Sequence, residues 1–213
     1  MDSTDRHHPA RPRLAAAAIW AGGAAWLTAV GAGLVSMSSY GAEPGAMTTP
    51  PARWPTTVPV GLDPVLPTLV LFAHPHCPCT QATLGELERV MARSKGHLVA
   101  RVLFYTDPRL GPRWERTASW DHAATIPGVH PQVDPMGETA RAFGARTSGF
   151  TALYAPDGRL LFHGGITASR GHEGDNAGAA AIIDLAAGGT ASVRSTAVYG
   201  CEIVGPEPEG RSR

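Results

Sequence analysis

Residues 68 to 80 read Thr68-Leu-Val-Leu-Phe-Ala-His-Pro-His-Cys-Pro-Cys-Thr80, and this stretch decides the fold. Its first six residues, 68–73, form a short apolar run of the kind that predicts a buried strand. A helix is predicted from Cys79 to Arg93, because apolar residues recur there at helical spacing. Two histidines and two of the three cysteines therefore stand where a strand gives way to a helix.

The rest of the chain continues this alternation of strands and helices. Strands are predicted over 98–105, 129–133, 150–154 and 160–163. The last two are joined by a strong turn signal, Pro156-Asp-Gly-Arg159, and should form a hairpin. Helices are predicted over 114–124, 137–143 and 177–187. Such an order predicts an α/β fold, with a parallel or mixed sheet flanked by helices on both faces.

Composition limits the classes of partner. The chain has 213 residues with 43% hydrophobic side chains, enough for one domain with a core, and its formal net charge is zero. No basic block lies beyond the first 13 residues. Nucleic acid is therefore not expected as a partner.

The N-terminal region predicts a single membrane anchor. Residues 14–37 carry no charge, and this length is enough to cross a hydrocarbon core of roughly 30 Å. Arg6, Arg11 and Arg13 precede this run, whereas no Lys or Arg follows until Arg53. The positive-inside rule then places residues 1–13 in the cytoplasm and the C-terminal domain outside it, on the periplasmic side.

A cleaved signal peptide is the alternative to this anchor. A weak small-x-small cleavage pattern is present at Ser39-Tyr40-Gly41. The apolar region of a signal peptide is usually about 7–15 residues, and the run here is longer. Both readings export the remainder of the chain, where disulfides can persist.

Proline content defines the expected boundaries beyond the anchor. Residues 38–67 hold seven prolines among Gly, Ser and Thr, which predicts an extended, semi-rigid linker. The folded domain is expected over 68–190. The remaining segment, 191–213, is expected to be a tail that carries Cys201 and is long enough to fold back.

The order of elements, with a cysteine motif between the first strand and helix, resembles the thioredoxin fold over residues 66–190. Pro78 and Cys79 match the proline and second cysteine of the family's Trp-Cys-Gly-Pro-Cys segment. Cys77 stands where the family has glycine, and His76 where it has its attacking cysteine. The motif is thus CxC rather than CxxC.

Downstream segments carry the same resemblance. Residues 140–146 are similar to the short helix and turn before the family's cis-proline loop, and 150–165 to its terminal hairpin. Ser148 or Gly149 stands at the cis-proline position. The closest resemblance is to RedB-type membrane-anchored thioredoxin-like proteins. It implies thiol–disulfide exchange with the thiols or disulfides of exported proteins, without a bound cofactor.

The redox hypothesis assigns Cys77, Cys79 and Cys201 to the chemistry. A helix N-terminus stabilises a thiolate near Cys79, and His74 or His76 would add to this if protonated. Cys77 is expected to be the more exposed of the pair. A Cys77–Cys79 bond would close a small, strained ring, so Cys201 is an alternative partner for either thiol.

A metal hypothesis uses the same residue types, since thiolate and imidazole ligands suit Cu(I) or Zn(II). Copper-delivery proteins with a thioredoxin fold pair two cysteines with one distant histidine. The candidate ligands here are Cys77, Cys79, Cys201, His74 and His76, with His163 and His172 as distant histidines. A third possibility is a non-catalytic domain whose cysteines only pack or form an inert disulfide.

Asp175 or Asn176 is predicted to cap the last helix.

Overall fold

The structure is a computed structural model that describes residues 12–203, with side chains from residue 15 onward. The chain divides into an N-terminal part that ends at Tyr40 and a second part that begins at Gly41.

The described residues of the N-terminal part belong to helix α1, which spans Pro12–Ala42. Its 31 residues correspond to about 46 Å at 1.5 Å per residue, more than the roughly 30 Å of a bilayer core. Residues Ala15–Ala42 are apolar enough to cross a membrane, and large side chains such as Trp20 and Met37 are exposed. The expected single apolar helix is therefore confirmed, and it is longer than the predicted 14–37.

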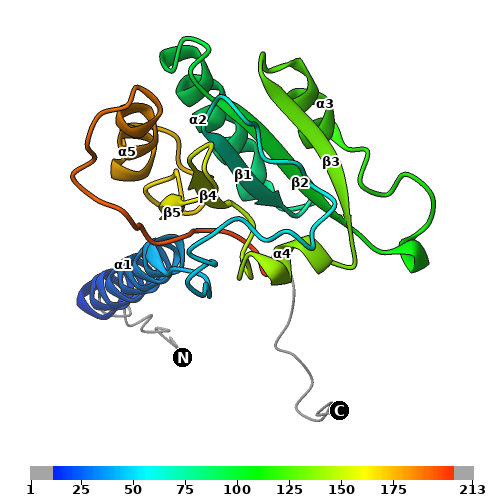
Figure 1. Ribbon diagram of the computed structural model, residues 1–213. Helices are drawn as coiled ribbons and strands as arrows, with labels where there is room; N and C mark the ends of the chain where they lie inside the picture. The colour runs from blue at the N-terminus through cyan, green and yellow to red at the C-terminus, as the bar shows by residue number, and fades with distance from the viewer. Residues whose placement is uncertain (1–11, 204–213) are drawn as a thin grey trace, which may run out of the picture. The chain divides into compact units, whose positions relative to one another are not determined.

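The second part is built on a five-stranded mixed sheet in the order β3-β2-β1-β4-β5 (Figure 1). Strand β1 pairs in parallel with β2, which pairs in parallel with β3, whereas β4 is antiparallel to β1 and to β5. The strands are Thr68–Ala73, Val99–Thr106, Val129–Pro135, Phe150–Tyr154 and Leu160–Gly164, from β1 to β5. The predicted strand–helix alternation is confirmed, and so is the mixed sheet.

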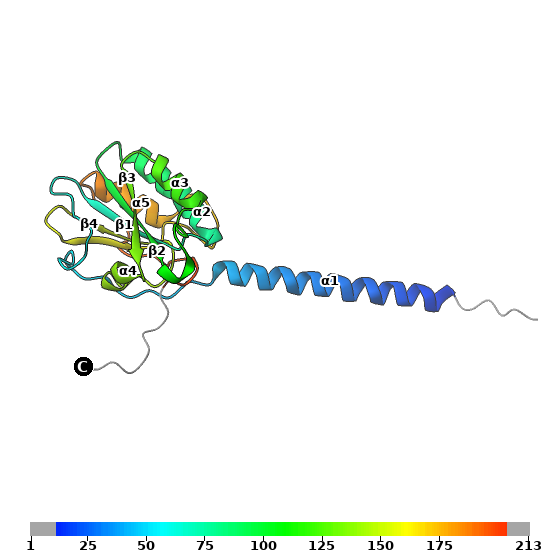
Figure 2. The same cartoon turned by 90° about the vertical axis from the view of Figure 1, so that its right-hand side faces the viewer.

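Three helices cover one face of this sheet (Figure 2). They are α2, Pro78–Arg93; α3, Ala118–Thr125; and α5, Ala177–Ala186. Leu84 and Leu87 of α2 are fully buried against Leu69 and Leu71 of β1. Helix α3 begins four residues later than the predicted 114, because the 3₁₀ turn Pro108–Leu110 and an irregular segment precede it.

The other face of the sheet is covered by a short helix and by residues that were expected to form a linker. The prediction of an extended linker over 38–67 is wrong for the residues that pack on this face. Helix α4, Glu138–Ala142, has only five residues, too few to cover a face that includes Phe72, Phe150 and Tyr154. Residues 43–67 complete the cover: Trp54 packs edge-on against Tyr154 with 5.3 Å between ring centroids. The Tyr154 hydroxyl also donates to the Pro51 carbonyl at 2.9 Å. This proline-rich segment is a layer of the domain rather than a free spacer.

The expected tail is likewise part of the domain as far as residue 203. It first runs beside β5, with a parallel bridge between His163 and Ser195. It then reaches the other end of the domain, where Val198 is fully buried and Ile203 is 8% exposed. The folded domain is thus wider than the predicted 68–190, because both flanking segments bury apolar side chains on it.

Candidate functional site

The junction between β1 and α2 holds the cysteine motif. Cys77 is the N-cap residue of α2 with an extended backbone, and Pro78 occupies the first turn, where its missing N–H costs no hydrogen bond. The Cys77 N–H donates to the His74 carbonyl at 3.1 Å. Cys77 is only 3% exposed, whereas Cys79 is half-buried. The predicted exposure of the pair is therefore reversed, because the chain turns the Cys77 side chain inward.

The third cysteine lies against the first. The Sγ atoms of Cys77 and Cys201 are 2.8 Å apart, although 124 positions separate them in the sequence. All three cysteines are free thiols. The backbone holds Cys201 there, because the Ser148 N–H donates to its carbonyl oxygen at 2.8 Å. The structure thus brings Cys201 to the motif and to Cys77 in particular.

A network of hydroxyl groups fixes the loop before the motif. The Ser148 Oγ accepts from the His74 N–H at 2.9 Å and lies 3.0 Å from the Thr80 Oγ1. The Thr80 hydroxyl is also within 3.0 Å of the His74 carbonyl as a donor. Both hydroxyl residues are buried. Sequence reasoning assigned Ser148 only to the cis-proline position and gave Thr80 no role, since neither has a local motif.

The three thiols differ in how readily they ionise. Burial opposes ionisation of Cys77, but hydrogen bonds from Cys201 and Cys79 outweigh burial and lower the pKa of Cys77 below its ordinary value. Burial and the neighbouring Cys77 raise the pKa of Cys79, and burial with the Cys77 hydrogen bond raises that of Cys201 to about 12. Of the three thiols, Cys77 is the one that the surrounding hydrogen bonds favour as the thiolate, with thiol and backbone N–H donors from Cys201 and Cys79.

One cation stands beside this cluster. Burial and Cys77 raise the pKa of Cys79 and of Cys201, and the positive charge of Arg170 offsets these rises only in part. Its guanidinium Nη1 donates to the Gly200 carbonyl, directly before Cys201. The arginine comes from the segment between β5 and α5, which sequence reasoning noted only for His172 and its capping residues.

The histidines of the motif belong to a separate aromatic cluster. His74 stacks on Tyr105 with 6.0 Å between ring centroids, and His76 packs on Trp114 at 4.5 Å. The His76 Nε2 also lies 3.0 Å from the Trp114 carbonyl oxygen. Burial, and then His76, lower the pKa of His74, so its ring is neutral at neutral pH. His74 therefore supplies no positive charge to a thiolate.

The distant histidines lie elsewhere in the domain. His163 is on β5, where its Nε2 is 3.2 Å from the Ser195 hydroxyl. His172 is exposed, and its backbone N–H donates to Ser169. Within residues 12–203, no three or more His, Cys, Asp or Glu side chains are grouped so as to hold a metal ion. Cys77 contacts Cys201 and Cys79, but in the described residues no histidine completes a metal site with them.

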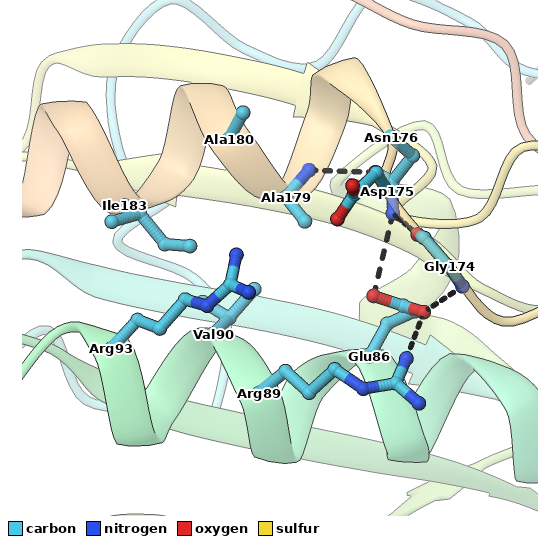
Figure 3. Close-up of a pocket in the computed structure, with 10 residues that line it drawn as sticks. All are labelled: Glu86, Arg89, Val90, Arg93, Gly174, Asp175, Asn176, Ala179, Ala180 and Ile183. Carbon is cyan, nitrogen blue, oxygen red and sulfur yellow. Dashed lines mark hydrogen bonds and ion pairs between the residues drawn. The ribbon is translucent and has the colours of Figure 1, made fainter.

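A buried carboxylate secures the loop beside the cysteines. Glu86 of α2 is 3% exposed, and its Oε1 accepts from the Gly174 N–H at 2.6 Å. Arg89 pairs with Glu86 and also with Glu173. Figure 3 shows Glu86, Arg89 and Gly174 at a cavity of about 250 Å³ that is lined by residues of α2 and α5. Sequence reasoning missed Glu86, which lies within the apolar stripe of α2.

The cap of the last helix is confirmed. The Asn176 side-chain oxygen accepts from the Ala179 N–H at 2.8 Å and so satisfies a free donor of the first turn of α5. Its amide nitrogen reaches the Glu86 Oε2 at 3.4 Å. Glu86 and Asn176 therefore hold the loop of residues 170–176 to both helices.

Comparisons with solved structures agree with this architecture. The chain is similar to a hypothetical protein, SMc02350, from Sinorhizobium meliloti 1021, with 18% identity and a TM-score of 0.56 over 78% of this chain and 96% of that one. The chain is also similar to an uncharacterized conserved protein from Geobacillus kaustophilus, with 15% identity and a TM-score of 0.52 over 78% of this chain and 94% of that one. The domain has a thioredoxin-like fold.

A third similar structure is an exposed lipoprotein thioredoxin, Etrx1, from Streptococcus pneumoniae strain TIGR4, with 16% identity and a TM-score of 0.40 over 58% of this chain and 85% of that one. No protein-family model and no curated protein matches the chain. The agreement with the expected thioredoxin-like fold rests on the sheet itself, in which β1 is parallel to β2 and antiparallel to β4, and β4 is antiparallel to β5.

Proposed function

We propose that the protein is a membrane-tethered thiol–disulfide oxidoreductase whose domain lies outside the cytoplasm and exchanges disulfides with exported proteins. The observation that carries the proposal is the contact between Cys77 and Cys201, 2.8 Å from sulfur to sulfur in a thioredoxin-like fold. Two thiols in contact, one of them favoured as thiolate, can form and break a disulfide with little movement of the chain. RedB-type membership is part of the same proposal and rests on the sequence motif.

The exchange reaction follows from the order of the pKa values. The Cys77 thiolate attacks a disulfide of the partner, and a mixed disulfide forms while the partner's other sulfur leaves as a thiolate and takes up a proton. Cys201 then loses its proton and attacks the Cys77 sulfur, which releases the partner's second sulfur. The partner disulfide has gained two electrons, and Cys77 and Cys201 are joined. The reverse sequence oxidises a partner dithiol.

Cys79 has a supporting role in this scheme. Its thiol donates a hydrogen bond to Cys77 and contributes to the lowered pKa of Cys77. A bond between Cys77 and Cys79 would have to close across Pro78, whose φ is fixed near −65°. Cys201 reaches Cys77 from a different segment and is not limited in this way, so it is the preferred resolving thiol.

The exported location completes the proposal. Helix α1 is long and apolar enough to anchor the chain, and three arginines precede the apolar run in the sequence. An extracytoplasmic domain experiences the oxidising conditions in which cysteine pairs are used for exchange. Fusion of a reporter active only outside the cytoplasm to the C-terminus tests this orientation, and an inactive fusion would contradict it.

The redox function is tested by counting thiols and metal on one sample of the full-length protein in detergent. After equilibration in glutathione buffers of graded ratio, we expect two thiols to disappear and return together while the third persists. Mass shifts after alkylation give the count. Three thiols that never change would contradict the proposal. About one equivalent of copper or zinc, lost on Cys77→Ser, would instead support the metal hypothesis.

A further inference from the structure

The segment that carries Cys201 is joined to the domain by an isolated antiparallel bridge. Glu202 forms an antiparallel bridge with Thr147. The Ile203 N–H donates to the Arg146 carbonyl at 2.8 Å, and the Ser148 N–H donates to the Cys201 carbonyl at the same distance. We use the term tip for residues 199–203. The tip therefore occupies the Arg146 carbonyl and the Ser148 N–H, the two backbone groups on either side of Thr147.

The tip also covers the reactive thiol. Cys77 is 3% exposed, and the Cys201 sulfur is in contact with it. A partner's disulfide cannot approach a sulfur so enclosed, because attack requires the three sulfurs to lie in line. Exchange with another protein therefore needs the tip to move. The covalent bond between Cys77 and Cys201 would forbid that movement, and reduction would permit it.

Two anchors delimit the part of the tail that can leave. Val198 is fully buried, and its carbonyl accepts from the Gly45 N–H at 2.8 Å. The segment just before it pairs with the end of β5, since the Gly165 N–H donates to the Ala197 carbonyl at 3.2 Å. The tip has only Ile203, at its far end, as a buried apolar side chain. Opening is therefore expected to hinge after Val198.

We propose that the tip is a built-in occupant of the docking edge for the partner, and that an extended, cysteine-bearing segment of an exported protein takes its place on residues 146–148 in the reduced state. This inference rests on the proposed function. The edge offers main-chain hydrogen bonds to an added strand, which gives affinity without reading the sequence. Return of the tip then delivers Cys201 to the mixed disulfide and displaces the product from the same edge.

The tip also indicates which partner segment fits. A Cβ atom on Gly200 would collide with the Ser148 carbonyl oxygen, and the Arg170 guanidinium binds the Gly200 carbonyl from another direction. Ile203, two residues after the cysteine, fills an apolar pocket of the core. A segment that follows the same path carries glycine before its cysteine and an apolar residue two positions after it.

The test uses full-length protein in detergent with Cys79→Ser and Cys201→Ser, so that Cys77 is the one thiol. A second form also ends after Val198 and lacks the tip. The probe is the peptide Tyr-Gly-Cys-Glu-Ile as its mixed disulfide with thionitrobenzoate, whose release reports attack by Cys77. A matched peptide carries Ala before Cys. Dithiobis(nitrobenzoate) measures the intrinsic reactivity of Cys77.

Removal of the tip should raise the rate with the Gly-Cys peptide by about tenfold or more, as expected when the site is open about a tenth of the time. The Ala-Cys peptide should then react about tenfold more slowly than the Gly-Cys peptide. If Cys77 reacts with dithiobis(nitrobenzoate) but the two peptides react at equal rates, or shortening the chain has no effect on the peptide rates, the inference is overturned and the proposed function is not. A Cys77 that reacts with neither peptide nor reagent would overturn the proposed function as well.

A second variant keeps the test independent of the folding of the shortened chain. Gly200→Ala leaves both anchors in place and should displace the tip through the collision with Ser148. We expect a faster reaction with the Gly-Cys peptide. Gly61→Ala is the matched control, because no atom lies within 4 Å of a Cβ built there. Identical rates for Gly200→Ala and Gly61→Ala would contradict displacement.

Discussion

The histidines and the cysteines of the segment 74–80 lie in different surroundings. Its histidines pack on Tyr105 and Trp114, whereas Cys77 contacts the sulfur of Cys201, which is 124 positions away in the sequence. Neighbours in the sequence therefore do not form one set of ligands here. The difference favours chemistry between sulfur atoms over a mixed sulfur and nitrogen metal site.

Loss of the central thiol should have the largest effect. Cys77→Ser should abolish the fast phase of the reaction of the full-length protein with dithiobis(nitrobenzoate) and leave only the slower reaction of Cys79 and Cys201, whose pKa values are raised. Stopped-flow absorbance measures both phases. Cys79→Ser is the matched control and should retain most of the fast phase. A Cys77→Ser protein that exchanges as fast as the Cys79→Ser protein would contradict the central position of Cys77.

Removal of the neighbouring donor should shift the pH dependence of Cys77. The hydrogen bond from Cys201 contributes to the lowered pKa of Cys77, so Cys201→Ala should raise that pKa. Because the thiolate forms only above the pKa, the rise in alkylation rate should move to higher pH, and the rate at neutral pH should fall severalfold. Iodoacetamide kinetics on chains with Cys79→Ser report mainly Cys77, because the pKa of Cys201 is raised to about 12 where that thiol is retained.

The control for this shift is a serine on the same tail. Ser192 is exposed and distant in sequence from the tip, so Ser192→Ala should leave the alkylation profile unchanged. A profile that is the same for Cys201→Ala and Ser192→Ala would show that the sulfur contact does not act on Cys77 in solution.

The buried carboxylate should matter for stability rather than for thiol chemistry. Glu86→Ala leaves the Gly174 N–H without its acceptor, which should lower the free energy of unfolding by about 1–3 kcal/mol. Glu88 is the control, because its side chain is 61% exposed and pairs only with His122 at 3.3 Å. Glu88→Gln should change the free energy by less than about 0.5 kcal/mol. Urea denaturation measures both, and equal losses would contradict the structural role of Glu86.

The histidines should have the smallest effect on the thiols. His76→Ala should change the alkylation rate of Cys77 by less than about twofold, since surface substitutions act within about 0.5 kcal/mol. Its ring packs on Trp114 and makes no hydrogen bond with sulfur in the described chain. A larger fall in the alkylation rate would show that His76 acts on Cys77. Copper that the unaltered protein retains and the His76→Ala protein loses would show that the histidines and cysteines form one metal site.

The elements of the domain could be predicted from the sequence because their signals are local. Apolar spacing located α2, and the Pro-Asp-Gly turn at 156–158 located the hairpin of β4 and β5. Asn176 could be predicted as a cap for the same reason. The proline-rich segment was misjudged because its composition describes a free chain, whereas Trp54 packs on a sheet face that the short helix α4 leaves uncovered.

The site could be predicted only in part. The cysteine motif could be recognised from its position between a strand and a helix. Cys201 could be predicted as a partner because it is the one other cysteine in the sequence. The reversed burial of Cys77 and Cys79 could not be found, because it depends on the direction in which the N-cap residue turns. The contacts of Glu86 with Gly174 and of Ser148 with Cys201 could not be predicted either, because each joins segments that are far apart in the sequence.

The most direct test of the account is the identity of the disulfide in the oxidised, full-length protein. Non-reducing peptide mapping with fragmentation can place the bond, and a parallel sample with Cys79→Ser resolves the two cysteines that share one tryptic peptide. The account predicts a peptide of Cys77 joined to a peptide of Cys201, with Cys79 alkylated as a free thiol. Cys201 found free in every oxidised sample would contradict it.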